Sequence, residues 1–107
     1  MLPVMVFITA KDEAEAAFIA HGLVEEGLAA CVNIIRSVRS IYRWEGRIED
    51  ENETLLIVKT RKNLFNALQA KVKTLHSYAV PEIIAVQIAE GSVEYLKWLM
   101  QETEPTA

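Results

Sequence analysis

The chain has 107 residues, of which 51% are hydrophobic and 24% charged, and its formal net charge is -4. This length and composition predict one domain over residues 1–107 with a packed core, and they argue against disorder. The acidic balance excludes nucleic acid as an expected partner, and no apolar run is long enough to span a membrane. A single cysteine excludes an intrachain disulfide framework, which favours a cytoplasmic protein.

The first two elements are expected to be a strand and a helix. Residues 2–9 are an apolar run that predicts a buried strand. Asp12 precedes Glu15 by three residues, which is the spacing of a reciprocal cap at a helix start. Gly27 is expected to end this helix in a left-handed conformation. The apolar residues expected on its core face are Ala16, Ile19, Ala20, Leu23 and Val24.

The stretch over residues 30–60 predicts a long β-hairpin. Two apolar runs rich in β-branched residues flank residues 43–46, a short break that ends in glycine. Each arm is about 14 residues, or roughly 46 Å, whereas a domain of this size is roughly 34 Å across. We therefore expect the hairpin to bend at Arg36 and Ser37 and to be covered by other subunits, with assembly as the main consequence.

A second helix is expected after Thr60, with an apolar stripe of Leu64, Leu68, Val72 and Leu75. Its basic neighbours Arg61, Lys62, Lys71 and Lys73 are expected to face solvent. Residues 83–88 predict a fourth strand, Ser92 is expected to cap a third helix, and the polar tail over residues 102–107 is expected to fray.

The resulting order predicts an α+β fold, a ferredoxin-like βαββαβ sandwich with an extra C-terminal helix. Both main helices would cover one face of an antiparallel sheet. The other face, carrying Ile34, Leu56 or their neighbours, would then need a cover, which is a second reason to expect an oligomer.

Few residues suggest chemistry. Cys31 has apolar neighbours, which favours a buried core thiol over a ligand for Cu(I) or zinc. His76 lies at a helix end near Tyr78 and Glu82, where it is either a residue favoured by the helix dipole or a ligand at a subunit cleft. Lys59 and Glu82 fit either a cleft for a small anionic or zwitterionic ligand or an interface ion pair.

Several sequence segments resemble the CutA divalent-cation tolerance proteins in order and spacing. They are residues 29–35 (AACVNII), 40–49 (SIYRWEGRIE), 59–60, 76–83 (HSYAVPEI) and 95–98 (YLKW). The resemblance implies a homotrimer. It also adds Tyr78 and Glu49 to the ligand cleft of Lys59 and Glu82, and it places Tyr42, Trp44 and Trp98 at motif positions. For these last aromatic residues we expect interface packing.

The resemblance implies a role in tolerance to copper and other divalent cations, with no catalytic residues and no required cofactor. Some CutA members have a cysteine and a second histidine where this chain has Ile8 and Leu75. Any metal contact is therefore expected to be weak or between subunits, from His76 and Glu82. Arg36 and Ser37 replace a Pro-Gly pair of the family, which affects the local bulge.

Two further classes of function follow from the same residues. The alternative to metal tolerance is a regulatory sensor similar to the PII proteins, which would bind a small ligand between subunits. An enzyme of the acylphosphatase type is not expected, because no phosphate-cradling loop occurs among the four dispersed glycines.

Overall fold

The computed structural model describes residues 2–103 and contains four strands and three α-helices. The predicted βαββαβ order with an additional helix is confirmed. Of the tail that was expected to fray, Glu102 still belongs to a helix, Thr103 is buried, and residues 104–107 lie outside the described residues. In chain order the elements are β1 (Pro3–Ala10), α1 (Glu13–Glu25), β2 (Cys31–Trp44), β3 (Arg47–Arg61), the 3-10 turn η1 (Lys62–Leu64), α2 (Phe65–Leu75), β4 (Ile83–Gln87) and α3 (Val93–Glu102).

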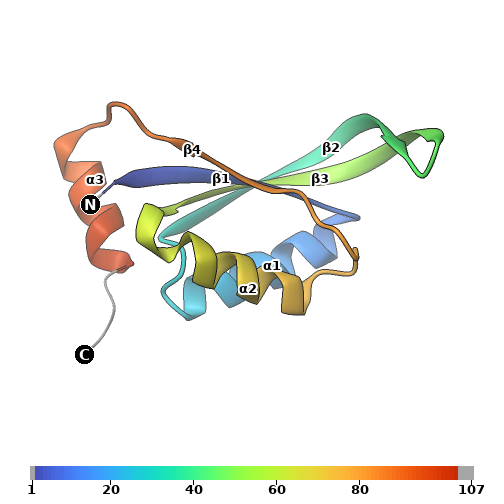
Figure 1. Cartoon of the computed structure of the whole chain (residues 1–107). Helices are drawn as coiled ribbons and strands as arrows, with labels where there is room; N and C mark the ends of the chain where they lie inside the picture. The colour runs from blue at the N-terminus through green and yellow to red at the C-terminus, as the bar shows by residue number, and fades with distance from the viewer. Residues whose placement is uncertain (1, 104–107) are drawn as a thin grey trace.

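The four strands form one antiparallel sheet in the order β2-β3-β1-β4. Figure 1 shows α1 and α2 side by side on one face of this sheet, with α3 at the end where the chain begins. This is the arrangement expected of a ferredoxin-like sandwich. Within residues 2–103, no helix has the length and apolar character needed to cross a membrane.

Helix α1 begins and ends as its sequence predicts, with two differences. Asp12 accepts a hydrogen bond from the Glu15 amide at 2.8 Å. The Glu15 carboxylate, however, accepts from the amide of Lys11 and not from that of Asp12. Gly27 has φ +70°, and its neighbour Leu28 bonds back to the helix end. Val24 was predicted in the core, but it is 46% exposed because it lies at the edge of the apolar stripe.

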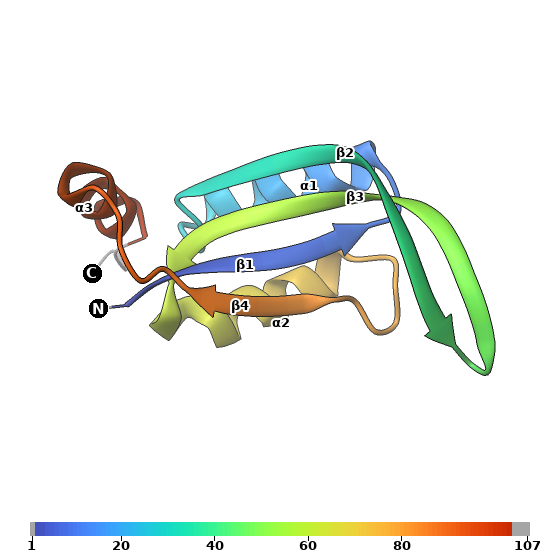
Figure 2. The ribbon, with the colours of Figure 1, turned by 90° about the horizontal axis from the view of Figure 1, so that it is seen from above.

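The hairpin bends where it was expected to bend. The β2–β3 register shifts between Ile35 and Val38, and Ser37 within this bulge has φ +57°. The turn itself is only Glu45 and Gly46, both with positive φ, so the strands extend further into the predicted break than expected. Figure 2 shows the outer half of the hairpin curving past the end of β1.

The sheet face away from α1 and α2 is apolar and uncovered in the single chain. Ile34 and Leu56, named in the prediction for this face, instead point to the helices and belong to or pack against the core. Side chains alternate along a strand, so it is their neighbours that occupy the open face. We define the open face by Met5, Phe7, Ile35, Leu55, Ile57, Ile84 and Val86.

The position of Arg61 differs from its prediction. It was expected to face solvent at the start of the second helix, but it is the last residue of β3 and only 4% exposed. Its side chain is bonded to the end of α3. Because strand β3 runs on to this residue, α2 begins later, after the 3-10 turn η1.

Candidate functional site

An open cleft of about 910 Å³ lies between the outer half of the hairpin and the connection from α2 to β4. Both segments reach the same end of the sheet in Figure 2. We call this the hairpin cleft. It is lined by Thr9, Ser40, Ile41, Tyr42, Trp44, Glu45, Glu49, Glu51, Glu53, Tyr78, Ala79, Val80 and Glu82. Its lining therefore combines carboxylates with aromatic rings and contains no lysine or arginine.

Two tyrosines of the hairpin cleft bind carboxylates, Tyr78 across the cleft and Tyr42 within the hairpin. The Tyr78 hydroxyl donates to Glu53 at 2.7 Å, and the Tyr42 hydroxyl donates to Glu51 at 3.1 Å. Burial, the bond to Glu53 and the nearby negative charge of Glu51 together raise the pKa of Tyr78 far above its usual value. The phenol of Tyr78 therefore stays protonated and neutral, and it acts as a hydrogen-bond donor.

His76 lies behind the cleft with its side chain closed to solvent. The Tyr78 amide donates to Nδ1 of His76 at 3.0 Å, so Nδ1 is an acceptor and the ring proton is on Nε2. Nε2 then donates to the Thr9 carbonyl at 2.7 Å. Both ring nitrogens are engaged within the chain, so a metal ion would have to displace one of these bonds to bind here.

Glu15 connects α1 to the same segment. Its carboxylate accepts from the amides of Lys11 and Ser77 and lies 3.7 Å from the His76 ring. Burial alone would raise the pKa of Glu15, but the hydrogen bonds from Ser77 and Lys11 hold the pKa below its ordinary value. Glu15 thus fixes the position of the connection that forms one wall of the cleft.

Replacing Glu15 with glutamine should lower the free energy of unfolding by about 1 kcal/mol at neutral pH, because the amide cannot accept as strongly from two N–H groups. The folded pKa is depressed, so this contribution is present above the ordinary pKa of 4.5 and is lost as pH falls through the folded value. Urea unfolding between pH 3 and 7 measures the difference.

The matched control is Glu13→Gln, since that carboxylate is 53% exposed and pairs only with an exposed arginine. It should change stability little at any pH. A Glu15→Gln variant whose deficit stayed constant from neutral pH down to the acid limit would contradict the assigned role of the carboxylate.

The structure brings together three of the four residues predicted for a ligand cleft, namely Tyr78, Glu49 and Glu82. The fourth, Lys59, is not among the lining residues. It lies toward the opposite end of β3, opposite Cys31 and Met5, and it donates to Asn33. Within one chain, Lys59 and Glu82 therefore do not converge.

The other predicted positions lie in the hairpin cleft, on α3 and on β2. Tyr42 and Trp44 line the hairpin cleft, and Trp98 on α3 is 38% exposed beside Tyr95. Cys31 was predicted to be a core thiol, which is wrong for the single chain. Val32 packs against the core, so alternation places Cys31 on the other side of the sheet, partly exposed.

Glu51 and Glu53, which accept the hydrogen bonds of the two tyrosines, were not predicted as site residues. The spacing of Glu49, Glu51 and Glu53 was the available signal, because residues two apart on a strand share a face. Among residues 2–103, no group of three or more His, Cys, Asp or Glu side chains is arranged to hold a metal ion.

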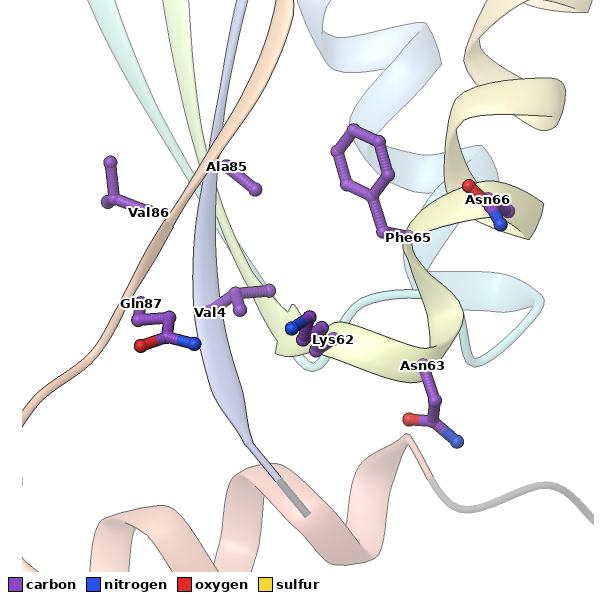
Figure 3. Close-up of a pocket in the computed structure, with 8 residues that line it drawn as sticks. All are labelled: Val4, Lys62, Asn63, Phe65, Asn66, Ala85, Val86 and Gln87. Atoms are coloured by element: carbon purple, nitrogen blue, oxygen red, sulfur yellow. The ribbon is translucent and has the colours of Figure 1, made fainter.

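A second pocket, of about 370 Å³, lies between the start of α2 and the outer edge of β4 (Figure 3). Phe65 and Ala85 point toward each other across it, whereas the amide of Asn63 points away and Val86 lies on the other side of β4. It contains none of the residues predicted for function. The hairpin cleft is therefore the better candidate site.

Comparison with known sequences decides the family. The sequence profile described as CutA1 divalent ion tolerance protein matches residues 4–102. The chain belongs to the CutA family. It is 52% identical over 99 residues to the divalent-cation tolerance protein CutA of Thermus thermophilus, covering 92% of this chain and 96% of that protein. It is 42% identical over 100 residues to the chloroplastic CutA of Arabidopsis thaliana, covering 94% of this chain but only 55% of that protein.

Solved CutA structures share the whole fold. The structure of the Thermus thermophilus protein has a TM-score of 0.93 at 51% identity, covering 95% of this chain and 99% of that one. CutA1 from Oryza sativa has a TM-score of 0.95 at 40% identity, covering 99% and 97%. The predicted resemblance to CutA proteins is thereby confirmed over nearly the full length of the described chain.

Proposed function

We propose that this CutA chain acts as a homotrimer in tolerance to divalent cations and catalyses no reaction. The observation that carries the proposal is the open face of the sheet. Ile84, Val86 and Ile35 are each about half exposed there, beside the partly buried Phe7 and Ile57. A contiguous apolar face of this kind is usually covered in a soluble protein, and further copies of the chain would cover it.

Assembly also fits the position of the hairpin. Its outer half extends past the sandwich and carries Ile41, Trp44 and Ile48, which are between 46% and 62% exposed. Neighbouring subunits that packed against the hairpin would bury these side chains. They would also close the open side of the hairpin cleft and place further ligands beside Glu49 and Glu82.

We propose that divalent cations, copper among them, bind weakly or between subunits, with Glu82 and His76 as the contributing residues of this chain. Glu82 is exposed at the rim of the hairpin cleft, and its carboxylate oxygens suit hard divalent cations. His76 would offer the softer nitrogen that copper and zinc prefer, once Nδ1 has lost its bond from Tyr78.

Calorimetric titration of the metal-free protein with Cu(II), Cu(I) and Zn(II) tests this site. We expect measurable binding that weakens at least about tenfold in both His76→Ala and Glu82→Gln, as loss of one ligand from a small site predicts. Glu90→Gln, an exposed carboxylate outside the cleft, is the matched control and should bind as the unchanged protein does. Binding indifferent to His76 and Glu82, or no binding, would rule out the direct metal site.

The relatives named above are all CutA proteins, so they give no support to the alternative of a PII-like sensor. Saturable binding of a small organic ligand without metal would be needed to revive it. We also propose a cytoplasmic location. Relatives differ in this respect, since the Arabidopsis protein is named chloroplastic and a solved CutA of Archaeoglobus fulgidus is described as periplasmic.

A further inference from the structure

The carboxyl end of α3 is bonded to a buried guanidinium. Arg61, at the end of β3, donates from Nε to the Thr103 hydroxyl at 3.0 Å and from Nη2 to the Met100 carbonyl. Thr103 is itself 1% exposed and donates its hydroxyl proton to the Leu99 carbonyl at 2.8 Å. One side chain from the sheet thus reaches the last turn of a helix 39 to 42 residues further along the chain.

Electrostatics favours this arrangement. The last carbonyls of a helix have no partners within the helix and carry partial negative charge, which a cation at that end complements. A buried guanidinium, in turn, must keep its hydrogen bonds, because burying an unsatisfied charge is very costly. The end of α3 is therefore stabilised by the charge of Arg61, and Arg61 is stabilised in its buried position by the hydrogen-bond acceptors of α3.

Within the single chain, the rest of α3 buries few side chains. Of its ten residues only Leu99 is fully buried, and Val93 at its start is 81% exposed. Figures 1 and 2 show α3 beyond the end of the sheet, apart from α1 and α2. Hydrogen bonds to a charged group stabilise a protein by an amount similar to the burial of one leucine. Arg61 is thus comparable to the hydrophobic anchor.

We propose that Arg61 is a latch for α3, which opens and closes on the sandwich as one unit and whose closed state depends on the bonds of Arg61 to Met100 and Thr103. The latch is a conformational device of the single chain, and it stands independently of the proposed metal contact.

Hydrogen exchange measured by mass spectrometry on the whole protein tests the latch. In Arg61→Met, amides of residues 93–103 should exchange about tenfold to a hundredfold faster, while those of β1 and β3 keep their rates. Thr103→Val, which removes the hydroxyl but keeps the shape, should act on the same amides. Arg61→Lys, which keeps the positive charge but loses the planar fork of donors, should fall between the methionine variant and the unchanged protein.

Lys62→Met is the matched control, because Lys62 is the residue after Arg61 and its side chain is exposed. In this variant the amides of α3 should exchange at the unchanged rate. Two results would overturn the latch. One is an Arg61→Met variant in which α3 keeps full protection. The other is faster exchange spread equally over α3, β1 and β3, which would show that Arg61 stabilises the whole chain and not one helix.

Discussion

Replacing Ile84 with aspartate is expected to convert the assembled protein into folded single chains. Ile84 lies on β4 opposite Phe7, in the middle of the open face, and is 54% exposed in one chain. The single chain tolerates a carboxylate there because water still reaches it. In an assembly that covers the open face, the same carboxylate would be buried without a partner, at a cost of several kcal/mol for each subunit.

Sedimentation equilibrium measures the result directly. The unchanged protein should have three times the 12.0 kDa mass of one chain, and Ile84→Asp should have the mass of one chain with its far-ultraviolet circular dichroism retained. Phe18→Asp is the control, since this side chain is 61% exposed on α1, on the helix side of the molecule. An Ile84→Asp protein that remained trimeric, or an unchanged protein that was already monomeric, would refute assembly through this face.

Local signals in the sequence predicted the elements well, because each acts within a few residues. Asp12 caps α1 and Gly27 ends it as expected, and Ser92 accepts the Tyr95 amide at the start of α3. The bend near Ser37 followed from the length of the hairpin. These features depend on backbone geometry that the local sequence largely determines.

The sequence did not reveal which residues would meet across the fold. Arg61 was assigned to solvent because basic residues usually are, and its partners lie about 40 residues away in α3. Cys31 was assigned to the core from its apolar neighbours, although alternation on the strand turns it to the other side of the sheet. In both cases the prediction of burial relied on residue type and apolar neighbours, whereas the position of the residue along its strand determined where the side chain lies.

The residues of the candidate site were predicted only in part. Tyr78, Glu49 and Glu82 do meet in the hairpin cleft, but Lys59 lies elsewhere, and Glu53 was missed. No lysine lines the cleft within the single chain. The fully engaged ring of His76 was also beyond the sequence, because its partners Thr9 and Tyr78 come from different elements.

Truncating Leu56 to alanine should cost the single chain about 2–5 kcal/mol of unfolding free energy, the range for a fully buried leucine that leaves a cavity. Leu56 is 0% exposed and belongs to the core between the sheet and the helices. Its neighbour Leu55 is the matched control, because it has the same chemistry on the same strand but lies on the open face. Leu55→Ala should cost about 1 kcal/mol or less, since part of its surface stays in water in one chain.

Urea denaturation followed by circular dichroism should be measured for both truncations in the monomeric Ile84→Asp background and again in the unchanged protein. In the monomer the two leucines should differ clearly. In the proposed trimer a neighbouring subunit would cover Leu55, so its truncation should become more costly and the difference should shrink. Equal costs in the monomer would contradict the assignment of the two sheet faces. A cost for Leu55 that did not change on assembly would contradict the burial of the open face between subunits.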